Sequence, residues 1–147
     1  MITGWVGNDT YSPEETIVLG QNLAKFVQSG DVFALKGDLA SGKTTFMKGV
    51  AKGLGYIGEV TSPTFTMVNE YECTPKIVHI DCYRESNIHR WLQLGISEYF
   101  NSDNVVFIEW SELISQLLPT NIIVIEFVNV GKNHHNIKLA KATKELV

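Results

Sequence analysis

The sequence predicts a three-layer α/β fold with a mainly parallel central sheet plus antiparallel strands. Short apolar runs that are typical of buried strands alternate along the chain with segments of helical periodicity. The chain has 147 residues, which suits one domain over 1–147 and is enough to bury a hydrophobic core. Apolar strands that alternate with helices are typical of a parallel sheet covered by helices on both faces.

The first helix has the clearest start signal. Ser12 can cap the helix, Pro13 suits its first position, and Glu15 completes a capping box three residues after the serine. We expect Ser29-Gly30 to end it. The predicted buried stripe consists of Leu19, Leu23, Phe26 and Val27.

The remaining elements follow from the same two periodicities. The predicted strands lie at 32–35, 64–72, 76–80, 104–108, 122–128 and 136–139, and the partly alternating stretch 64–72 is expected to be antiparallel. Helices are predicted over 43–53, 88–100 and 111–118, and Pro119 stops the last of them.

Composition and charge argue against several classes of protein. The formal net charge is −4, and arginine occurs only at Arg84 and Arg90, so we expect neither DNA binding nor independent RNA binding. The apolar runs are too short to cross a bilayer and the N-terminus does not resemble a signal peptide, which predicts a cytoplasmic protein without membrane contact. Cys73 and Cys82 lack metal-site spacing and are expected to be buried free thiols.

One motif predicts a phosphate-binding loop. Residues 37–44 satisfy G-x-x-x-x-G-K-[ST] at every fixed position, between an apolar strand and a helix. Glycines let successive backbone N–H groups converge on anionic oxygens, and the helix that follows directs its positive end to the same place. Lys43 would then add a charge at the β and γ phosphates, and the Thr44 hydroxyl would bind Mg²⁺.

Two acids follow apolar strands and are candidates for the magnesium side of the site. Asp81 comes directly after 77–80, and Glu109 comes after 105–108. Ligands of open α/β sheets collect at the carboxyl ends of strands, although a strand-end acid can also cap the next helix. Glu109 has the cleaner pattern, because His79 interrupts the run before Asp81.

The patterns around three histidines favour structural positions over catalytic or metal-binding roles. His79 shares a strand face with Asp81, and we interpret it as a core residue or as a residue behind the functional groups. His134 and His135 follow the turn at Gly131 without further ligands at zinc spacing, which favours surface positions.

Five stretches together resemble the TsaE (YjeE-type) ATPases of bacterial tRNA modification. They are 37–46, Ser62-Pro63-Thr64-Phe65, 79–84, 94–100 and Ile108-Glu109-Trp110. Their order and approximate gaps match the family over essentially the whole chain. The resemblance implies a P-loop NTPase fold that binds ATP or ADP together with Mg²⁺.

The resemblance also implies partners and a place in a process. A protein of this family acts with TsaB and TsaD in making N6-threonylcarbamoyladenosine beside the anticodon of tRNA. It does not transfer the threonylcarbamoyl group itself, but its ATP hydrolysis supports repeated turnover. Contact with tRNA would be indirect, through the TsaB–TsaD complex.

Matching the family's motifs to this sequence assigns the expected site residues one by one. Catalytic roles fall on Lys43, Asp81, Glu109 and Thr64, and metal contacts fall on Thr44, Glu109 and Asp81. Nucleotide contacts are expected from the loop and from one lysine far along the chain: Gly37, Asp38, Leu39, Ala40, Ser41, Gly42, Lys43, Thr44, Thr45 and Lys132. Ala40 and Lys132 depart from the family pattern, which usually has glycine and arginine there.

Alternatives remain at this point. A small-molecule kinase shares the loop but generally needs several arginines around the transferred phosphoryl group. A GTPase is disfavoured because the sequence has no Asn-Lys-x-Asp element, and a nucleotide-gated docking module with negligible hydrolysis stays open. The shortage of arginine predicts slow hydrolysis by the isolated chain and stimulation by a partner.

Overall fold

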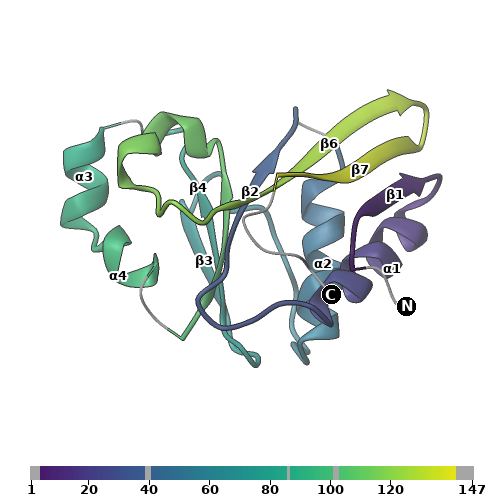
Figure 1. Ribbon diagram of the computed structural model, residues 1–147, viewed down its shortest axis with the longest axis horizontal. Helices are drawn as coiled ribbons and strands as arrows, with labels where there is room; N and C mark the ends of the chain where they lie inside the picture. Colours follow the sequence, from purple (N-terminus) through teal and green to yellow (C-terminus); the bar gives the residue numbers. More distant parts are fainter. Residues whose placement is uncertain (1–3, 39–40, 86, 101–102, 142–147) are drawn as a thin grey trace.

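The computed structural model describes residues 4–38, 41–85, 87–100 and 103–141, so Leu39 and Ala40 of the predicted loop lie outside the described residues. Within this part of the chain, seven strands form one sheet in the order β1-β7-β6-β2-β5-β4-β3 (Figure 1). The strands are β1 (Gly7–Thr10), β2 (Val32–Lys36), β3 (Val68–Tyr71), β4 (Ile77–Asp81), β5 (Val105–Glu109), β6 (Ile123–Gly131) and β7 (His134–Lys141).

The centre of the sheet is parallel and its edges are antiparallel. β2 pairs in parallel with both β5 and β6, and β4 pairs in parallel with β5. β3 adds an antiparallel strand beside β4, while β7 and β1 add two beyond β6. The predicted sheet, mainly parallel with antiparallel additions, is confirmed.

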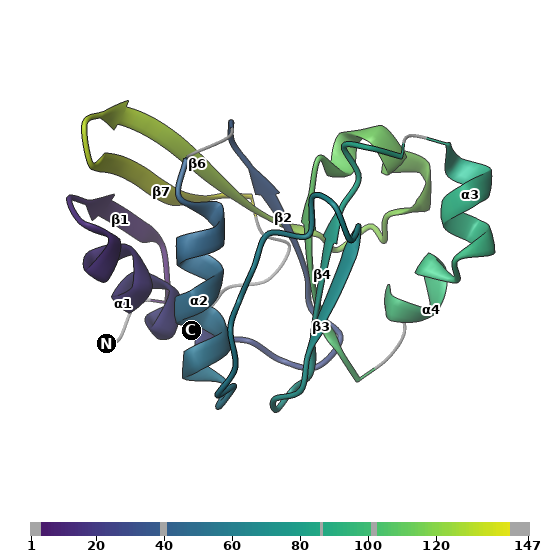
Figure 2. The same ribbon diagram turned by 180° about the vertical axis from the view of Figure 1, so that it is seen from behind.

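Helices cover both faces of this sheet, as Figures 1 and 2 show. α1 (Pro13–Ala24) and α2 (Lys43–Gly53) lie on one face. α3 (Ile88–Gln93), α4 (Ile96–Phe100) and the 3₁₀ helix η1 (Ser111–Leu117) lie on the other. The three-layer arrangement is therefore confirmed.

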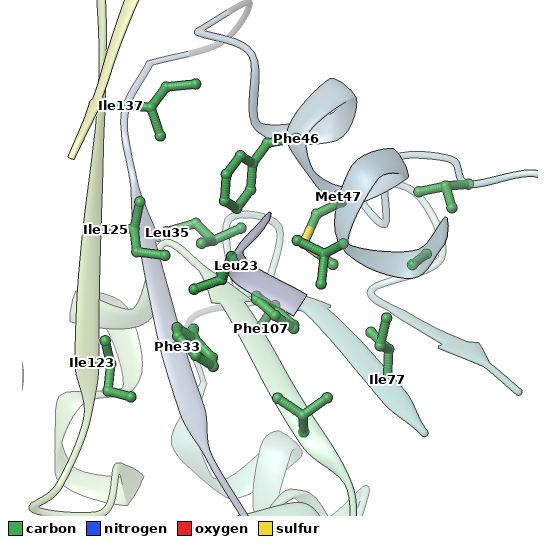
Figure 3. Packing of buried hydrophobic residues seen from close by; sticks show 14 of the residues in the cluster. Leu23, Phe33, Leu35, Phe46, Met47, Ile77, Phe107, Ile123, Ile125 and Ile137 are labelled. Carbon is green, nitrogen blue, oxygen red and sulfur yellow. The ribbon is translucent and has the colours of Figure 1, made fainter. Parts of the chain in front are cut away.

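Alternate side chains of each strand point to opposite layers and build two cores. Leu23 of α1 and Phe46 of α2 pack with Phe33, Leu35 and Phe107 of the sheet (Figure 3). The second core lies under the other helices and includes Val78, Ile80, Trp91, Ile96, Val106, Ile108 and Ile114. Both sets of side chains are almost fully buried, so β2, β4 and β5 are held rigidly from both sides.

Ser12 caps α1 as predicted, but Glu15 accepts from the residue before Ser12 rather than from Ser12 as in a capping box, and the helix is shorter than expected. Ser12 Oγ accepts a hydrogen bond from the Glu15 N–H at 3.1 Å, and Glu15 Oε1 accepts one from the Tyr11 N–H at 3.1 Å. The helix ends at Ala24, because the N–H of Phe26 bonds three residues back to Leu23 and tightens the last turn.

Two other predicted elements are corrected. The antiparallel strand begins at Val68 rather than at residue 64, because Met67 has φ 68° and its N–H bonds back to Pro63 in a turn. The helix predicted over 88–100 is two short helices, since Gly95 between them has φ 77°, where glycine is favoured.

The outer antiparallel strands extend beyond their predicted limits. β1 was not predicted, because its sequence has no apolar run, and it exists by pairing with β7. β6 and β7 are also longer than the predicted strands at 122–128 and 136–139, because they continue outward as a hairpin.

The two cysteines are both free thiols but differ in burial. Cys73 and Cys82 are free, but only Cys82 is fully buried.

Among the described residues, none of the helices is long and apolar enough to cross a membrane.

Candidate functional site

Sheet register brings the two predicted acids to one edge. Glu109 at the end of β5 is paired with Leu35 of β2 and with Asp81 at the end of β4. The chain leaves β2 at this edge and enters the predicted phosphate loop. The two acids and the loop therefore meet where ligands of parallel sheets usually bind.

The loop ends at a helix whose first amides are open. Gly42 precedes α2 with φ 98°, and among the residues that the structure describes no side chain caps the helix start. The first N–H groups of a helix have no partners within it, and the macrodipole makes this end positive. An anion can therefore be held at the start of α2 without displacing a side-chain cap.

The loop backbone is packed closely at its other end. A Cβ on Gly37 would lie 2.6 Å from the Phe127 carbonyl oxygen and 2.8 Å from Ser41 Oγ, so only glycine fits there. Ser41 is 1 % exposed, and its Oγ has no hydrogen-bond partner among the described residues. A buried hydroxyl without a partner is costly, so this oxygen is available to a ligand in the loop.

Lys43 is held between the loop and an acid. Its ammonium donates to the Gly37 carbonyl oxygen and lies 3.4 Å from Glu109 Oε1. The residue is 6 % exposed, and the Trp110 ring centroid lies 5.8 Å from Nζ. The ammonium is thus preorganised at the start of α2, with a buried carboxylate as its counter-charge.

Glu109 has a second partner, His79. Its Oε2 lies 2.7 Å from His79 Nε2, although the two residues are 30 positions apart in sequence. Burial raises the pKa of the Glu109 carboxyl, but the interaction with His79, followed by the charge of Lys43, outweighs it, so the pKa lies below its ordinary value. The acid is therefore ionised at neutral pH.

Asp81 belongs to a separate hydrogen-bonded group. Its Oδ2 accepts from Thr64 Oγ1 at 3.0 Å, and Thr64 Oγ1 lies 2.8 Å from Ser62 Oγ. The Tyr83 N–H donates to the other oxygen of Asp81 at 2.9 Å. The Ser-Pro-Thr-Phe segment is thereby tied to the end of β4.

A cavity of about 230 Å³ joins most of the predicted site. Its lining includes Lys43, Thr44, Thr64 and Glu109, together with Gly42, Thr45, Ser62 and His135. A neighbouring groove of about 330 Å³ is lined by Asp38, Thr64, Asp81, Tyr83 and Trp110. Thr64 lines both the cavity and the groove, so the Ser-Pro-Thr-Phe segment borders the space at Glu109 as well as the space at Asp81.

The far end of the chain brings a histidine to the cavity, and Lys132 is not among the residues that line it within the described part of the chain. Lys132 is exposed in the turn between β6 and β7, whereas His135 of β7 lines the cavity beside Gly42. His134 is partly buried, stacks on Tyr11 with ring centroids 4.4 Å apart, and lies 3.0 Å from Asp9 Oδ2. The expected surface histidines are thus both engaged, because the hairpin folds back toward the loop.

The donor set fits a magnesium ion that comes with phosphates. Among the described residues, no cluster of three histidine, cysteine or acidic side chains could hold a metal on its own. Mg²⁺ usually takes one or two carboxylates, keeps several waters and shares phosphate oxygens. Thr44 and Glu109 at the cavity, with Asp81 beside it, offer oxygen donors of this kind.

Comparison with known proteins identifies the family. The family model described as "Threonylcarbamoyl adenosine biosynthesis protein TsaE" matches residues 10–137. The chain belongs to the TsaE family. The match spans every element from α1 to β6 and reaches into β7, including the phosphate loop and both acids.

Individual members of the TsaE family agree with this assignment. A protein from Bacillus subtilis named "tRNA threonylcarbamoyladenosine biosynthesis protein TsaE" is 40 % identical over 129 residues, covering 87 % of this chain and 80 % of that protein. Proteins of the same name from Haemophilus influenzae and Treponema pallidum are 35 % and 33 % identical, over 84 % and 88 % of this chain and 92 % and 96 % of theirs.

A solved structure supports the fold. The crystal structure of Bacillus subtilis YdiB superposes with a TM-score of 0.78 at 35 % sequence identity. The superposition covers 95 % of this chain and 86 % of that chain. The likeness extends over the whole sheet and both helical layers, so the chain has the P-loop NTPase fold that the sequence predicts.

Proposed function

We propose that this chain is the Mg²⁺-dependent ATP-binding and ATP-hydrolysing component of tRNA N6-threonylcarbamoyladenosine biosynthesis in the cytoplasm, acting with TsaB and TsaD. The names of its relatives support the process. The observation that carries the nucleotide part is the position of Lys43, buried at the start of α2 near the Ser41 hydroxyl, which has no hydrogen-bond partner within the described part of the chain.

The charges of the site favour a polyphosphate over a neutral ligand. Lys43 is neutralised by Glu109, and taking Lys43 away from that acid is favourable only if another anion receives the ammonium. In the proposal Gly37, Asp38, Ser41, Gly42 and Thr45 shape the phosphate cradle. Leu39 and Ala40, outside the described residues, belong to the same loop.

The acids and hydroxyls provide the magnesium side. Thr44 and Glu109 would hold Mg²⁺ together with the nucleotide, and Asp81 would organise the metal shell or a water molecule. When bound, Mg²⁺ supplies positive charge that offsets the phosphate oxygens. Thr64, already bonded to Asp81, would sense the γ-phosphate, and its release from Asp81 would move the exposed Phe65.

Slow hydrolysis by the isolated chain follows from where its arginines lie. The Arg84 guanidinium is 4.9 Å from the Phe65 ring centroid, and Arg90 lies 3.9 Å from Glu85. Neither lines the cavity or the neighbouring groove, as far as the described residues define them. An arginine supplied by a partner raises such rates by about 10³ to 10⁵, so the TsaB–TsaD complex is expected to stimulate hydrolysis.

Two measurements test the proposal. Calorimetry should detect binding of ATP and ADP, and Mg²⁺ should strengthen it; no affinity for adenine nucleotides in the presence of Mg²⁺ would refute the proposal. Phosphate release should be slow for the chain alone and faster after TsaB and TsaD are added. A phosphorylated small molecule among the products would instead indicate a kinase, and unchanged negligible release would indicate a docking module.

A further inference from the structure

The buried histidine on β4 has one target. His79 is 0 % exposed, and its Nε2 lies 2.7 Å from Glu109 Oε2. An ionised carboxylate can only accept a hydrogen bond, so the hydrogen between them is assigned to His79 Nε2. The other ring nitrogen, Nδ1, has no hydrogen-bond partner among the described residues. The polar function of this buried ring is therefore directed at Glu109.

The two oxygens of Glu109 have partners of different kinds. Oε2 is held by His79, whose strand is fixed between β3 and β5 and packed on both faces. Oε1 faces Lys43 at 3.4 Å, and Lys43 is the residue that bound phosphates would attract. Only the His79 contact can persist when Lys43 changes partner.

We propose that His79 is a positioning residue that holds Glu109 by Oε2 and leaves Oε1 for the magnesium side of a bound nucleotide. This inference rests on the nucleotide binding proposed above. Glu109 without His79 keeps its carboxylate but loses the donor that orients it. Hydrogen-bond partners behind a metal-binding group typically contribute about 10-fold to 100-fold in metal affinity.

A comparison of nucleotide affinity with and without Mg²⁺ tests this role. The protein is titrated with a non-hydrolysable ATP analogue in EDTA and in Mg²⁺, and the ratio of the two dissociation constants measures the magnesium contribution. His79→Leu should lower this ratio by about 10-fold or more, while the affinity in EDTA stays within about twofold, because the loop is unchanged.

Two further variants separate positioning from packing. His79→Gln keeps an N–H donor at the reach of Nε2 and should restore most of the ratio. His79→Asn is also polar, but its amide extends only to the position of Nδ1. It should therefore lower the ratio as much as His79→Leu does. If His79→Leu does not fold, the contrast between glutamine and asparagine decides the question.

A double-mutant cycle gives the outcome that would overturn the inference. In a Glu109→Ala background, His79→Leu should have no further effect on the ratio, because there is no carboxylate to position. Two results would contradict the positioning role while leaving nucleotide binding intact. One is a wild-type ratio of dissociation constants in His79→Leu. The other is that His79→Leu lowers the ratio just as much in the Glu109→Ala background as it does in the wild-type protein. Absence of Mg²⁺-dependent binding in the wild-type protein would overturn both proposals.

Discussion

Two opposite charges lie buried beside the phosphate loop. Lys43 and Glu109 are 6 % and 5 % exposed, and Nζ of Lys43 lies 3.4 Å from Oε1 of Glu109. Removing one member of such a pair leaves an uncompensated buried charge, which costs several kcal/mol, about 3–5 by precedent. Each member of the pair is therefore needed for the stability of the folded protein. In the proposed nucleotide binding, Lys43 exchanges Glu109 for phosphate.

Substitution of each member should separate binding from turnover. Lys43→Ala should abolish nucleotide binding, because the ammonium that receives the phosphates is gone. Glu109→Ala should keep nucleotide but lose hydrolysis, measured by calorimetry and phosphate release. Lys48→Ala, on the exposed side of the same helix, is the matched control. Wild-type hydrolysis by Glu109→Ala would remove this acid from the mechanism.

The lowered pKa of Glu109 predicts an acid dependence of stability. Because the folded-state pKa is below the ordinary value of 4.5, the contribution of this acid is fully present above that value. It is lost as the pH falls toward the folded-state pKa. Glu109→Gln should be less stable than the wild-type protein at neutral pH. Its urea unfolding midpoint should also fall less steeply than the wild-type midpoint as the pH is lowered.

An exposed glutamate provides the comparison for this acid effect. Glu59→Gln removes a carboxylate from the surface and should keep the steep wild-type decline. A decline that is equally steep in Glu109→Gln would mean that other acids dominate the acid transition.

At the scale of elements, two helices touch through glycines. A Cβ on Gly49 of α2 would lie 2.0 Å from the Ile17 carbonyl oxygen of α1, and a Cβ on Gly20 would lie 2.3 Å from the Phe46 carbonyl oxygen. The backbones of α1 and α2 therefore approach too closely for any side chain. This contact sets the position of α2, whose start carries the phosphate site.

Gly49→Ala should destabilise the protein even though alanine favours a helix. The gain in helix propensity is about 1 kcal/mol, but the clash is with backbone and cannot be relieved by a rotamer change. Overpacking of this kind costs about 1–3 kcal/mol or more. Urea unfolding measures the difference, and Gly131→Ala, which meets nothing within 4 Å, is the control. Unchanged stability would show that the helices can separate freely.

At the scale of the whole molecule, the sheet links the site to the second core. Cys82 follows Asp81 directly and is 0 % exposed in the core beneath α3 and α4. Burial, followed by the negative charges of Asp81 and Glu112, raises the pKa of the Cys82 thiol to about 12. A thiol in this state is neither accessible nor ionised at neutral pH.

Alkylation of Cys82 should therefore report unfolding of the molecule. Iodoacetamide at neutral pH should leave Cys82 unmodified in the folded protein and modify it in urea, as followed by mass spectrometry. Cys73→Ser removes the partly buried second thiol, so that a single site is observed. Rapid modification of Cys82 without denaturant would indicate that the layer formed by α3 and α4 opens in the native state.

Much of this architecture could be predicted because it depends on neighbours in sequence. The apolar runs that became β2, β4 and β5 are buried as expected, and Ser12 and Glu15 cap α1. Predictions failed where the local signal was weak or absent. β1 has no apolar run and exists only beside β7, and Met67 adopts a left-handed conformation that its residue type does not suggest.

By itself the sequence determined the layers, the loop at 37–44 and the two strand-end acids, because periodicity and motif spacing act over a few residues. Only the tertiary structure decided that His79 bonds to Glu109, that Thr64 bonds to Asp81, and that His135 lines the cavity. These contacts join residues far apart in the chain. Strand register and the fold of the hairpin set them, and neither is encoded in a local pattern.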